Sequence, residues 1–378
     1  MSFNIKKEIK QFKKRIDDLK LSVNKHYSTQ NPCFFITGGT GFIGTKILCY
    51  ITELYPYSNI YVLMRDRKNH LAKDRLNSIF DNHLIKNTKN IKMIKGNYNK
   101  QNMGISHFDQ DTLSKKVDCI LHFGCNTNYT YDYNKSKQSV IEPSLFILKL
   151  ASTYKKKIII YSDSCIRHVY PLYPTSMMYG FHKGYCISKY INYQLMTYAR
   201  DTLDIDINIM TIGYAQSSHN NTPDYTDALE SVWFSMIQLQ MFPNFDFYID
   251  YSDIDVVLQK VLDPKQLFCL PAECSVHCKK PIYWKSLFPI FQSLYPDMKR
   301  VSPLCFRQQL SKLFRQYPLV SYIGTIENDG FMTDHLERDM NAMFRSVLKQ
   351  PEKNLDIPTP SKQYIQFVIK NLKRSCFQ

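Results

Sequence analysis

Tyr185 and Lys189 are four residues apart in a stretch, 184–198, that the sequence predicts to be helical. Residues at this spacing lie on one face of a helix, so a phenol and an ammonium can serve the same cavity. An ammonium lowers the pKa of a neighbouring phenol, which suits the phenol to protonating an oxyanion as a general acid. The pair is also common by chance on solvated helices. It indicates chemistry here only if other elements bring a reactant to it.

A glycine-rich turn provides a place for such a reactant. It directly follows a short apolar run at 33–36 and opens a helix predicted over 42–54. The glycine spacing allows a tight turn, close approach of a diphosphate to the backbone, and tight packing of the helix on the strand. The free N–H groups and the positive dipole at the start of the helix favour phosphates. We predict a dinucleotide site with contacts from Gly38, Thr40, Gly41, Phe42, Ile43 and Gly44.

The end of the second predicted strand, 60–64, distinguishes the two nicotinamide cofactors. An acidic residue there suits the ribose 2′-hydroxyl of NADH, whereas arginine suits the 2′-phosphate of NADPH. Arg65 comes first after the strand, and Arg75 follows ten residues later. We therefore predict NADPH as the cofactor, with Arg65 and Arg75 as contacts and Lys189 at the nicotinamide ribose. Asp66 leaves NADH open.

Short apolar runs alternate with helical stretches from residue 32 onward. The predicted strands are 33–36, 60–64, 91–94, 118–121, 158–161 and 207–210. This alternation is typical of α/β proteins with a Rossmann-type, doubly wound parallel sheet. After residue 220, helical segments at 227–241, 285–295 and 305–317 indicate a smaller, mostly helical lobe. We expect a basic helix and linker at 1–30, an NADP-binding domain at 31–220 and a substrate-binding lobe at 221–378.

The first thirty residues contain an apolar stripe with helical spacing. Its members are Ile5, Ile9, Phe12, Ile16 and Leu19. Such a stripe favours packing against the protein's own body, but a carrier-docking element, a coiled-coil arm or peripheral membrane contact stays open. Glu8, Asp17 and Asp18 argue against a mitochondrial presequence.

Composition bounds the partners and the compartment. Lys and Arg number 49 against 33 Asp and Glu, a formal charge of +16 that favours anionic partners such as nucleotides, coenzyme A or an acidic carrier. The lysines are spread along the chain, so compositional bias explains them equally well, and no nucleic-acid partner is expected. The 11 cysteines form no CxxC pair, which indicates reduced thiols and no metal site. No apolar run is long enough to span a membrane, so we expect a cytoplasmic protein.

With these residues in place, the chain resembles the extended short-chain dehydrogenase/reductase superfamily. More narrowly, it is similar to the thioester reductase group, which includes terminal reductase domains of polyketide and nonribosomal peptide synthases, carboxylic acid reductases and fatty acyl-CoA reductases. The resemblance runs from about residue 33 to the C-terminus. Its specific markers are the segments 37–44, 62–65 with 75–76, and 184–189, and looser similarities occur at 95–97, 122–125 and 251–257.

The resemblance implies NADPH-dependent reduction of an acyl thioester to an aldehyde or alcohol. The acyl donor would be acyl-CoA or a phosphopantetheine carrier protein, and Tyr185 would supply the proton. Relatives place a Ser or Thr hydroxyl at the end of the fifth strand, where Asp163 falls in this sequence. Because a carboxylate would repel an oxyanion, we assign that role to Ser164, with Ser162 second. Asn97 and Gly124 are expected at the cofactor.

The sequence departs from the group's pattern at several positions. Asn97 replaces an aspartate expected at the adenine, although its amide oxygen can still accept a hydrogen bond. Ser139 replaces an asparagine, and Thr211-Ile212-Gly213 replaces Arg-Pro-Gly. These departures leave the fold prediction unchanged but bear on full activity.

Two other readings remain open at this point. One is a different extended reductase, such as a sugar-nucleotide epimerase or dehydratase. The other is a catalytically impaired NADP-binding scaffold, which Asp163 supports and the retained Tyr185–Lys189 pair opposes. Aromatic residues of the second lobe suit an acyl chain better than a sugar nucleotide, but they fit an ordinary core equally well. These residues are Trp233, Phe234, Phe242, Phe245 and Phe247.

Overall fold

The computed structural model divides the chain into two compact units, which are described separately below. The first unit contains the described residues of 1–167, 184–211 and 258–274, and the second contains mainly those of 212–257 and 275–378. The structure describes residues 4–19, 28–66, 71–82, 85, 88–127, 131–154, 158–164, 183–203, 205–216, 228–276, 278, 280–314, 341 and 359–374.

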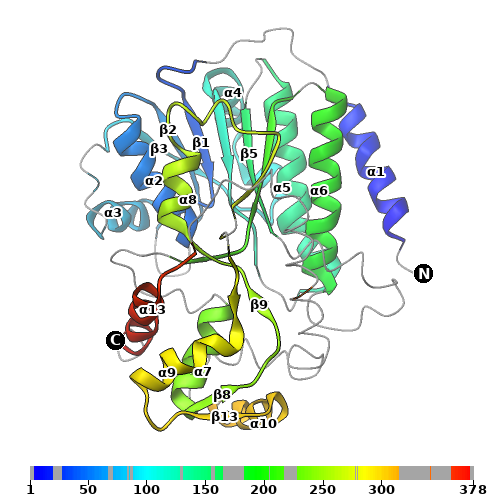
Figure 1. Cartoon of the computed structure of the whole chain (residues 1–378). Helices are drawn as coiled ribbons and strands as arrows, with labels where there is room; N and C mark the ends of the chain where they lie inside the picture. Colours follow the sequence, from blue (N-terminus) through cyan, green and yellow to red (C-terminus); the bar gives the residue numbers. More distant parts are fainter. Residues whose placement is uncertain are drawn as a thin grey trace. The chain divides into compact units, whose positions relative to one another are not determined.

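A seven-stranded sheet organises the first unit (Figure 1), in the order β11-β6-β5-β4-β1-β2-β3. The pairs from β3 through β5 are all parallel. All six predicted strands form, which confirms the doubly wound α/β fold, and β11 is a seventh strand that the sequence did not predict. The strands are β1 Phe34–Thr37, β2 Ile60–Met64, β3 Ile91–Lys95, β4 Cys119–His122, β5 Ile158–Ser164, β6 Ile207–Ile212 and β11 Glu273–Val276.

The central strands are buried on both faces, because every residue of β1, β2 and β4 is buried. Right-handed crossovers place α2 and α3 on one face of the sheet and α4, α5 and α6 on the other, since the chain moves outward from β1 in opposite directions. The carboxyl ends of the paired parallel strands therefore meet at one edge. The helices are α2 Phe42–Leu54, α3 Ala72–Asn82, α4 His107–Lys116, α5 Tyr133–Ser152 and α6 Lys183–Leu203.

The N-terminal helix α1, Ile5–Asp17, packs outside α5 and α6 (Figure 1). Its apolar stripe is turned inward, with Ile5, Phe12 and Ile16 at most 4% exposed. Polar contacts fix the same face: the two terminal nitrogens of the Arg15 guanidinium donate to the Glu142 carboxylate, each across 2.8 Å. Of the possibilities that the sequence left open, packing on the protein's own body is the one observed.

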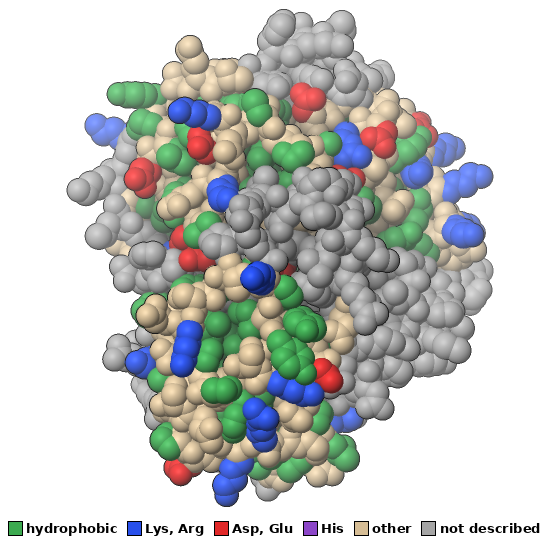
Figure 2. Space-filling view, viewed as in Figure 1, with side chains coloured by type: hydrophobic (Ala, Val, Ile, Leu, Met, Phe, Trp, Pro, Cys, Tyr) green, Lys and Arg blue, Asp and Glu red, His purple; other side chains and the backbone are tan. Residues whose placement is uncertain are grey.

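No helix in the described part of the chain has the length and apolar character needed to cross a bilayer. Lys and Arg side chains are scattered over the surface in Figure 2, interspersed with acidic and neutral ones, as their spread along the sequence predicts.

In the described residues of the second unit, helices combine with three two-stranded ribbons, β7 with β10, β8 with β13, and β9 with β12. Its helices are α7 Ala228–Leu239, α9 Phe288–Leu294, α10 Pro303–Phe314 and α13 Lys362–Arg374, and the 3-10 turn η4 covers Trp284–Leu287. The ribbon strands are β7 Tyr214–Gln216, β8 Met241–Pro243, β9 Tyr248–Ile249, β10 Tyr251–Asp253, β12 Ile282–Tyr283 and β13 Lys299–Val301.

The aromatic residues of the second unit form its core. Trp233 and Phe242 are fully buried, and their rings lie 5.8 and 5.9 Å from the ring of Phe291. The ring of Trp284 lies 5.2 to 5.6 Å from those of three Phe residues in the same cluster. These side chains therefore stabilise the unit, and the acyl-chain lining that their composition suggested loses its support.

The two units interleave along the chain, unlike the single boundary expected at residue 220. Helix α8, Ile254–Val261, runs from the second unit into the first, and the segment after it returns to the sheet. The hydroxyl of Tyr55, at the end of α2, donates to the carbonyl oxygen of Leu262 across 3.0 Å. Leu262 and Leu267 are fully buried. The sheet thus acquires its last strand from a part of the sequence that carries no strand pattern of its own.

Candidate active site

The glycine turn is held by close backbone contacts that leave no room for side chains. Gly38 has a φ of +80°, and a Cβ on it would lie 2.7 Å from the Cα of Gly124. A Cβ on Gly44 would overlap the carbonyl oxygen of Gly38. The register that pairs Thr37 with His122 brings the ends of β1 and β4 together at this point. Gly38, Gly44 and Gly124 are therefore required by geometry.

Helix α2 begins at this turn without a side-chain cap. Its N-cap residue, Gly41, makes no capping hydrogen bond, and the first turn contains no acidic residue. Gly41 is exposed, and Thr40, Phe42 and Ile43 are partly exposed. The uncapped N–H groups and the helix dipole suit an anionic group, so the cradle fits the diphosphate of a dinucleotide.

Basic groups dominate the end of β2. The guanidinium of Arg75 donates to the carbonyl oxygen of Arg65 across 3.0 Å, which brings the two predicted arginines together. The carboxylate of Asp66 forms an ion pair with Lys95 and accepts from the N–H of Ala72. The hydrogen bond from Lys95, followed by that from Ala72, lowers the pKa of Asp66. Asp66 is thus occupied by protein groups.

The end of β3 differs from the expectation for Asn97. The Oδ1 atom of Asn97 accepts the N–H of Asn99 across 3.0 Å, so the amide oxygen supports its own turn. The next residue, Tyr98, is not among the predicted site residues. Its hydroxyl hydrogen-bonds with Thr37 and with the backbone of Gly38, and a Cβ on Gly124 would overlap it. Burial raises the pKa of Tyr98, so the phenol stays neutral. Tyr98 forms one wall of the cradle.

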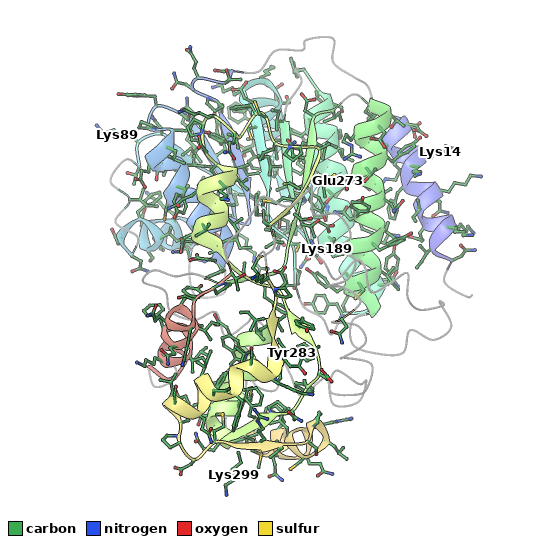
Figure 3. All side chains as sticks on the ribbon, in the orientation of Figure 1. Lys14, Lys89, Lys189, Glu273, Tyr283 and Lys299 are labelled. Carbon is green, nitrogen blue, oxygen red and sulfur yellow. The ribbon has the colours of Figure 1, made fainter. Side chains whose placement is uncertain are left out.

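The Tyr185–Lys189 pair lies inside the first unit, on α6. Tyr185 is 4% exposed and Lys189 is 3% exposed, and the Lys189 Nζ atom lies 5.8 Å from the centre of the Tyr185 ring. Figure 3 labels Lys189 within the first unit. The same ammonium lies 5.5 Å from the Tyr161 ring and donates to the carbonyl oxygen of Ser162 across 3.5 Å. Burial by itself lowers the pKa of Lys189, but interactions with Cys125 and Tyr161 outweigh it and raise the pKa. Because Cys125 follows Gly124, the pair lies close to the glycine turn.

Strand β5 continues three residues past its last pairing with β4, at Tyr161. Ser162 is partly exposed, and Asp163 is 2% exposed and accepts from the Tyr161 hydroxyl across 3.4 Å. The backbone of Ser164 ends the strand, but its side chain lies outside the described residues. The oxyanion donor assigned to Ser164 therefore stays a prediction.

Two other departures from the group's pattern lie at Ser139 and at 211–213. The Ser139 hydroxyl, at the position of the group's asparagine, is buried and donates to carbonyl oxygens of its own helix. Of the Arg-Pro-Gly pattern only Gly213 is retained, at a position where a Cβ would overlap the Asp250 carboxylate, and nothing in the structure explains the replacement of Arg and Pro by Thr211 and Ile212. Among the described residues, no group of three or more His, Cys, Asp and Glu side chains could hold a metal ion.

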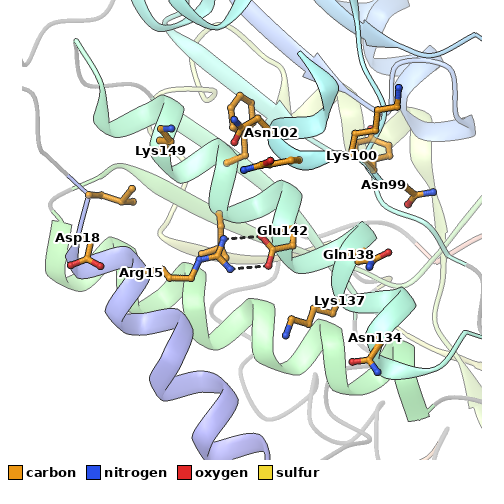
Figure 4. Close-up of a pocket in the computed structure, with 15 residues that line it drawn as sticks. Arg15, Asp18, Asn99, Lys100, Asn102, Asn134, Lys137, Gln138, Glu142 and Lys149 are labelled. Carbon is orange, nitrogen blue, oxygen red and sulfur yellow. Dashed lines mark hydrogen bonds and ion pairs between the residues drawn. The ribbon is translucent and has the colours of Figure 1, made fainter. Parts of the chain in front are cut away.

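A cavity of about 840 Å³ lies between α1, α5 and the 3-10 turn η1, Gln101–Gly104 (Figure 4). The Arg15–Glu142 pair crosses it, with Lys100, Lys137 and Lys149 along its sides. Its charge is partly cancelled, because Glu142 neutralises Arg15 and the ammonium of Lys137 lies 3.1 Å from Glu8. The lining of the cavity is therefore less positive than its lysines alone would suggest.

The parallel sheet, the glycine cradle and the buried Tyr–Lys pair define a nicotinamide-dependent oxidoreductase fold of the extended short-chain dehydrogenase/reductase class. Residues 36–261 match the family model described as "Male sterility protein", and the chain belongs to this family.

Its curated relatives are much longer proteins. The L-2-aminoadipate reductase large subunit of Penicillium chrysogenum is 29% identical over 133 residues, which are 34% of this chain and 9% of that protein. A carboxylic acid reductase of Segniliparus rugosus is 26% identical over 136 residues, 33% of this chain and 11% of that protein. The matched region is thus only about a tenth of each relative.

Solved structures share the fold over almost the whole chain. The terminal R domain from the myxalamid PKS-NRPS biosynthetic pathway has a TM-score of 0.78 at 14% identity, covering 98% of this chain and 99% of that one. A dTDP-glucose 4,6-dehydratase from Bacillus anthracis in complex with NAD has a TM-score of 0.52 at 11% identity and covers only 72% of this chain and 84% of that one.

Proposed function

We propose that the chain binds NADPH and reduces an acyl thioester to an aldehyde or an alcohol. The observation that carries this proposal is the position of Lys189. Its ammonium interacts with Cys125, the residue after Gly124, and Gly124 packs on Gly38 of the glycine turn. A dinucleotide whose diphosphate lies on α2 has its other end directed toward the Tyr185–Lys189 pair.

The charges at the end of β2 support NADPH over NADH. Asp66, the acidic residue that could bind a ribose hydroxyl, is engaged by Lys95 and by the N–H of Ala72. Arg65 and Arg75 remain as cations at the same strand end, where a guanidinium suits a 2′-phosphate.

The proposed chemistry divides among three side chains. Lys189, with its raised pKa, stays protonated at neutral pH and keeps a positive charge beside Tyr185. Tyr185 donates a proton to the carbonyl oxygen of the substrate. Ser164 donates a hydrogen bond to that oxygen, with Ser162 as the second candidate. The reduced nicotinamide, when bound, supplies the hydride. The hemithioacetal formed by this hydride and proton then loses its thiol, whose sulfur takes up the hydroxyl proton, so the products are an aldehyde and free coenzyme A or carrier thiol. A second hydride and proton convert the aldehyde to the alcohol.

The proposed substrate is an acyl group on coenzyme A or on a phosphopantetheine carrier protein. Two relatives are named as reductases of aminoadipate and of carboxylic acids. The R domain covers 98% of this chain, whereas the sugar-nucleotide dehydratase covers 72%, which supports a reductase-type substrate lobe. Both proposed donors carry phosphate, in keeping with the formal charge of +16.

Replacing Tyr185 by Phe tests the proposal. NADPH oxidation is measured with long-chain acyl-CoA and with acyl-pantetheine, and turnover by Tyr185→Phe should fall about a hundredfold or more. Tyr198→Phe is the matched control, because Tyr198 lies on the same helix and its hydroxyl donates to the carboxylate of Asp17 at the surface. Equal turnover by the unaltered chain and Tyr185→Phe would rule out the assigned proton donor.

A non-catalytic NADP-binding scaffold is the second candidate, and the buried Asp163 at the end of β5 favours it. A scaffold binds NADPH with normal affinity but oxidises none of it with any acyl donor, and Tyr185→Phe then changes nothing. The binding titration and the turnover assay together separate the two candidates.

A further inference from the structure

Four buried polar side chains form a continuous hydrogen-bonded chain beneath the candidate site. Thr37 Oγ1 lies 2.7 Å from Nδ1 of His122, and Nε2 of His122 lies 3.1 Å from the Ser144 hydroxyl. Asn192 Nδ2 donates to the same hydroxyl across 2.9 Å. All four residues are at most 3% exposed.

The bonds determine which ring nitrogen of His122 carries the proton. The Ser144 hydroxyl donates its hydrogen to the carbonyl oxygen of Val140 across 2.9 Å, so it accepts from its other partners. It therefore accepts from Nε2–H of His122, and the unprotonated Nδ1 accepts the hydroxyl hydrogen of Thr37. The Thr37 oxygen in turn accepts the N–H of Gly124 across 3.2 Å.

The chain connects the two halves of the candidate site. At one end, the Gly124 N–H lies in the loop that packs on Gly38 and leads to Cys125. At the other end, Asn192 lies on α6, three residues after Lys189 and seven after Tyr185, on the same helix face. The cofactor cradle and the catalytic helix are thus joined through a single imidazole.

We propose that His122 is a positioning residue that holds the 123–125 loop in register with α6, so that a cofactor bound at the glycine turn meets the Tyr185–Lys189 pair. The inference rests on the proposed function. His122 takes no part in proton transfer, because both ring nitrogens are used within the protein and the ring is 3% exposed. Its neighbours Thr37, Ser144 and Asn192 act through it and through the Gly124 amide.

The first test measures the Gly124 amide and needs no cofactor. Hydrogen exchange is followed by NMR in the unaltered chain, in Asn192→Ala and in Thr52→Val. Asn192→Ala should speed exchange of the Gly124 amide about tenfold. The effect has to pass through Ser144 and His122 to Thr37, which accepts the Gly124 N–H. Thr52→Val is the control, because the Thr52 hydroxyl donates only within its own helix. Unchanged exchange in Asn192→Ala overturns the inference.

The second test measures NADPH affinity in Thr37→Val, Asn192→Ala and the double variant. Each single substitution should weaken NADPH binding about tenfold. The double variant should bind NADPH no more weakly than the weaker-binding single variant, because the hydrogen bonds act as one unit. Thr37→Ser keeps the hydroxyl and should restore binding. Additive losses, or no loss in Asn192→Ala, contradict the positioning role. Absence of NADPH binding by the unaltered chain contradicts the proposed function instead, and the exchange test then decides the inference alone.

Discussion

The guanidinium of Arg75 donates to the backbone carbonyl oxygen of Arg65 across 3.0 Å. A side chain on α3 is thereby fixed over the end of β2, where the ribose of a dinucleotide lies in this class of fold. The neighbouring carboxylate of Asp66 is turned to Lys95. The contact therefore sets the charge at the proposed ribose site.

Arg75→Ala should weaken NADPH binding about tenfold or more and leave NADH binding nearly unchanged, because only NADPH carries the 2′-phosphate. Fluorescence titrations with both cofactors measure the ratio of affinities. Lys116→Ala, at the exposed end of α4, is the control for a general loss of positive charge. Equal losses for the two cofactors would mean that Arg75 supports the fold and does not read the phosphate.

Gly44→Ala and Gly41→Ala should fail in different ways. A Cβ on Gly44 overlaps the carbonyl oxygen of Gly38, so Gly44→Ala should destabilise the chain by about 1–3 kcal/mol or more. The nearest atom to a Cβ on Gly41 is 3.3 Å away, so Gly41→Ala should keep most of the stability. Because Gly41 is exposed at the uncapped end of α2, that variant should instead lose NADPH affinity. Thermal unfolding and NADPH titration of both variants test whether Gly44→Ala loses stability and Gly41→Ala loses affinity.

The buried imidazole of His122 should make stability depend on pH. Burial, followed by the charge of Lys189, lowers the pKa of His122 from 6.5 to about 3. The unfolded chain therefore binds a proton below pH 6.5 that the folded chain excludes. The contribution of this group is fully present above pH 6.5, is lost as pH falls toward 3, and reaches a loss of about 2 kcal/mol at pH 5.

Urea unfolding at several pH values between 7 and 5 measures this loss, and His122→Asn should flatten the pH dependence. His107→Asn, at an exposed histidine, serves as the control and should leave it unchanged. If the unfolding free energy of His122→Asn fell with pH as steeply as that of the unaltered chain, other groups would cause the acid sensitivity.

Ile16→Ala should destabilise the first unit by about 2–4 kcal/mol, because the side chain is fully buried where α1 packs on the body. Lys14→Ala, on the exposed face of the same helix, should change the unfolding free energy little. Denaturant unfolding of the two variants compares them directly. If Ile16→Ala were as stable as the unaltered chain, α1 would not be a structural element of this unit.

The sequence predicted the sheet, the glycine turn and the helix α6 that carries Tyr185 and Lys189, because all three depend on short-range patterns. The six strands appear as apolar runs, and the glycine turn of residues 38–44 is specified by spacing within one strand–turn–helix unit. The prediction failed for β11, because residues 273–276 lack an apolar strand pattern. They pair with β6 only after α8 has returned the chain to the sheet. The prediction also missed Tyr98, whose role depends on Gly124 lying opposite it.

Asn192 was within reach of sequence reasoning, since its spacing from Tyr185 and Lys189 places all three on one face of α6. The hydrogen-bond partner of Asn192, Ser144, lies 48 residues away on α5. Helical periodicity specifies the face, but the crossing of two helices specifies the partner.

The amino-acid sequence by itself thus determined the fold class, the glycine cradle and the helix that carries a phenol and an ammonium together, because a helix or a tight turn is set by neighbours in the chain. The tertiary structure alone decided that Asp66 is engaged by Lys95, that the aromatic residues of the second unit are core, and that His122 joins β1 to α6. Each of these depends on strand register and crossovers, which bring together residues tens of positions apart that no local pattern relates.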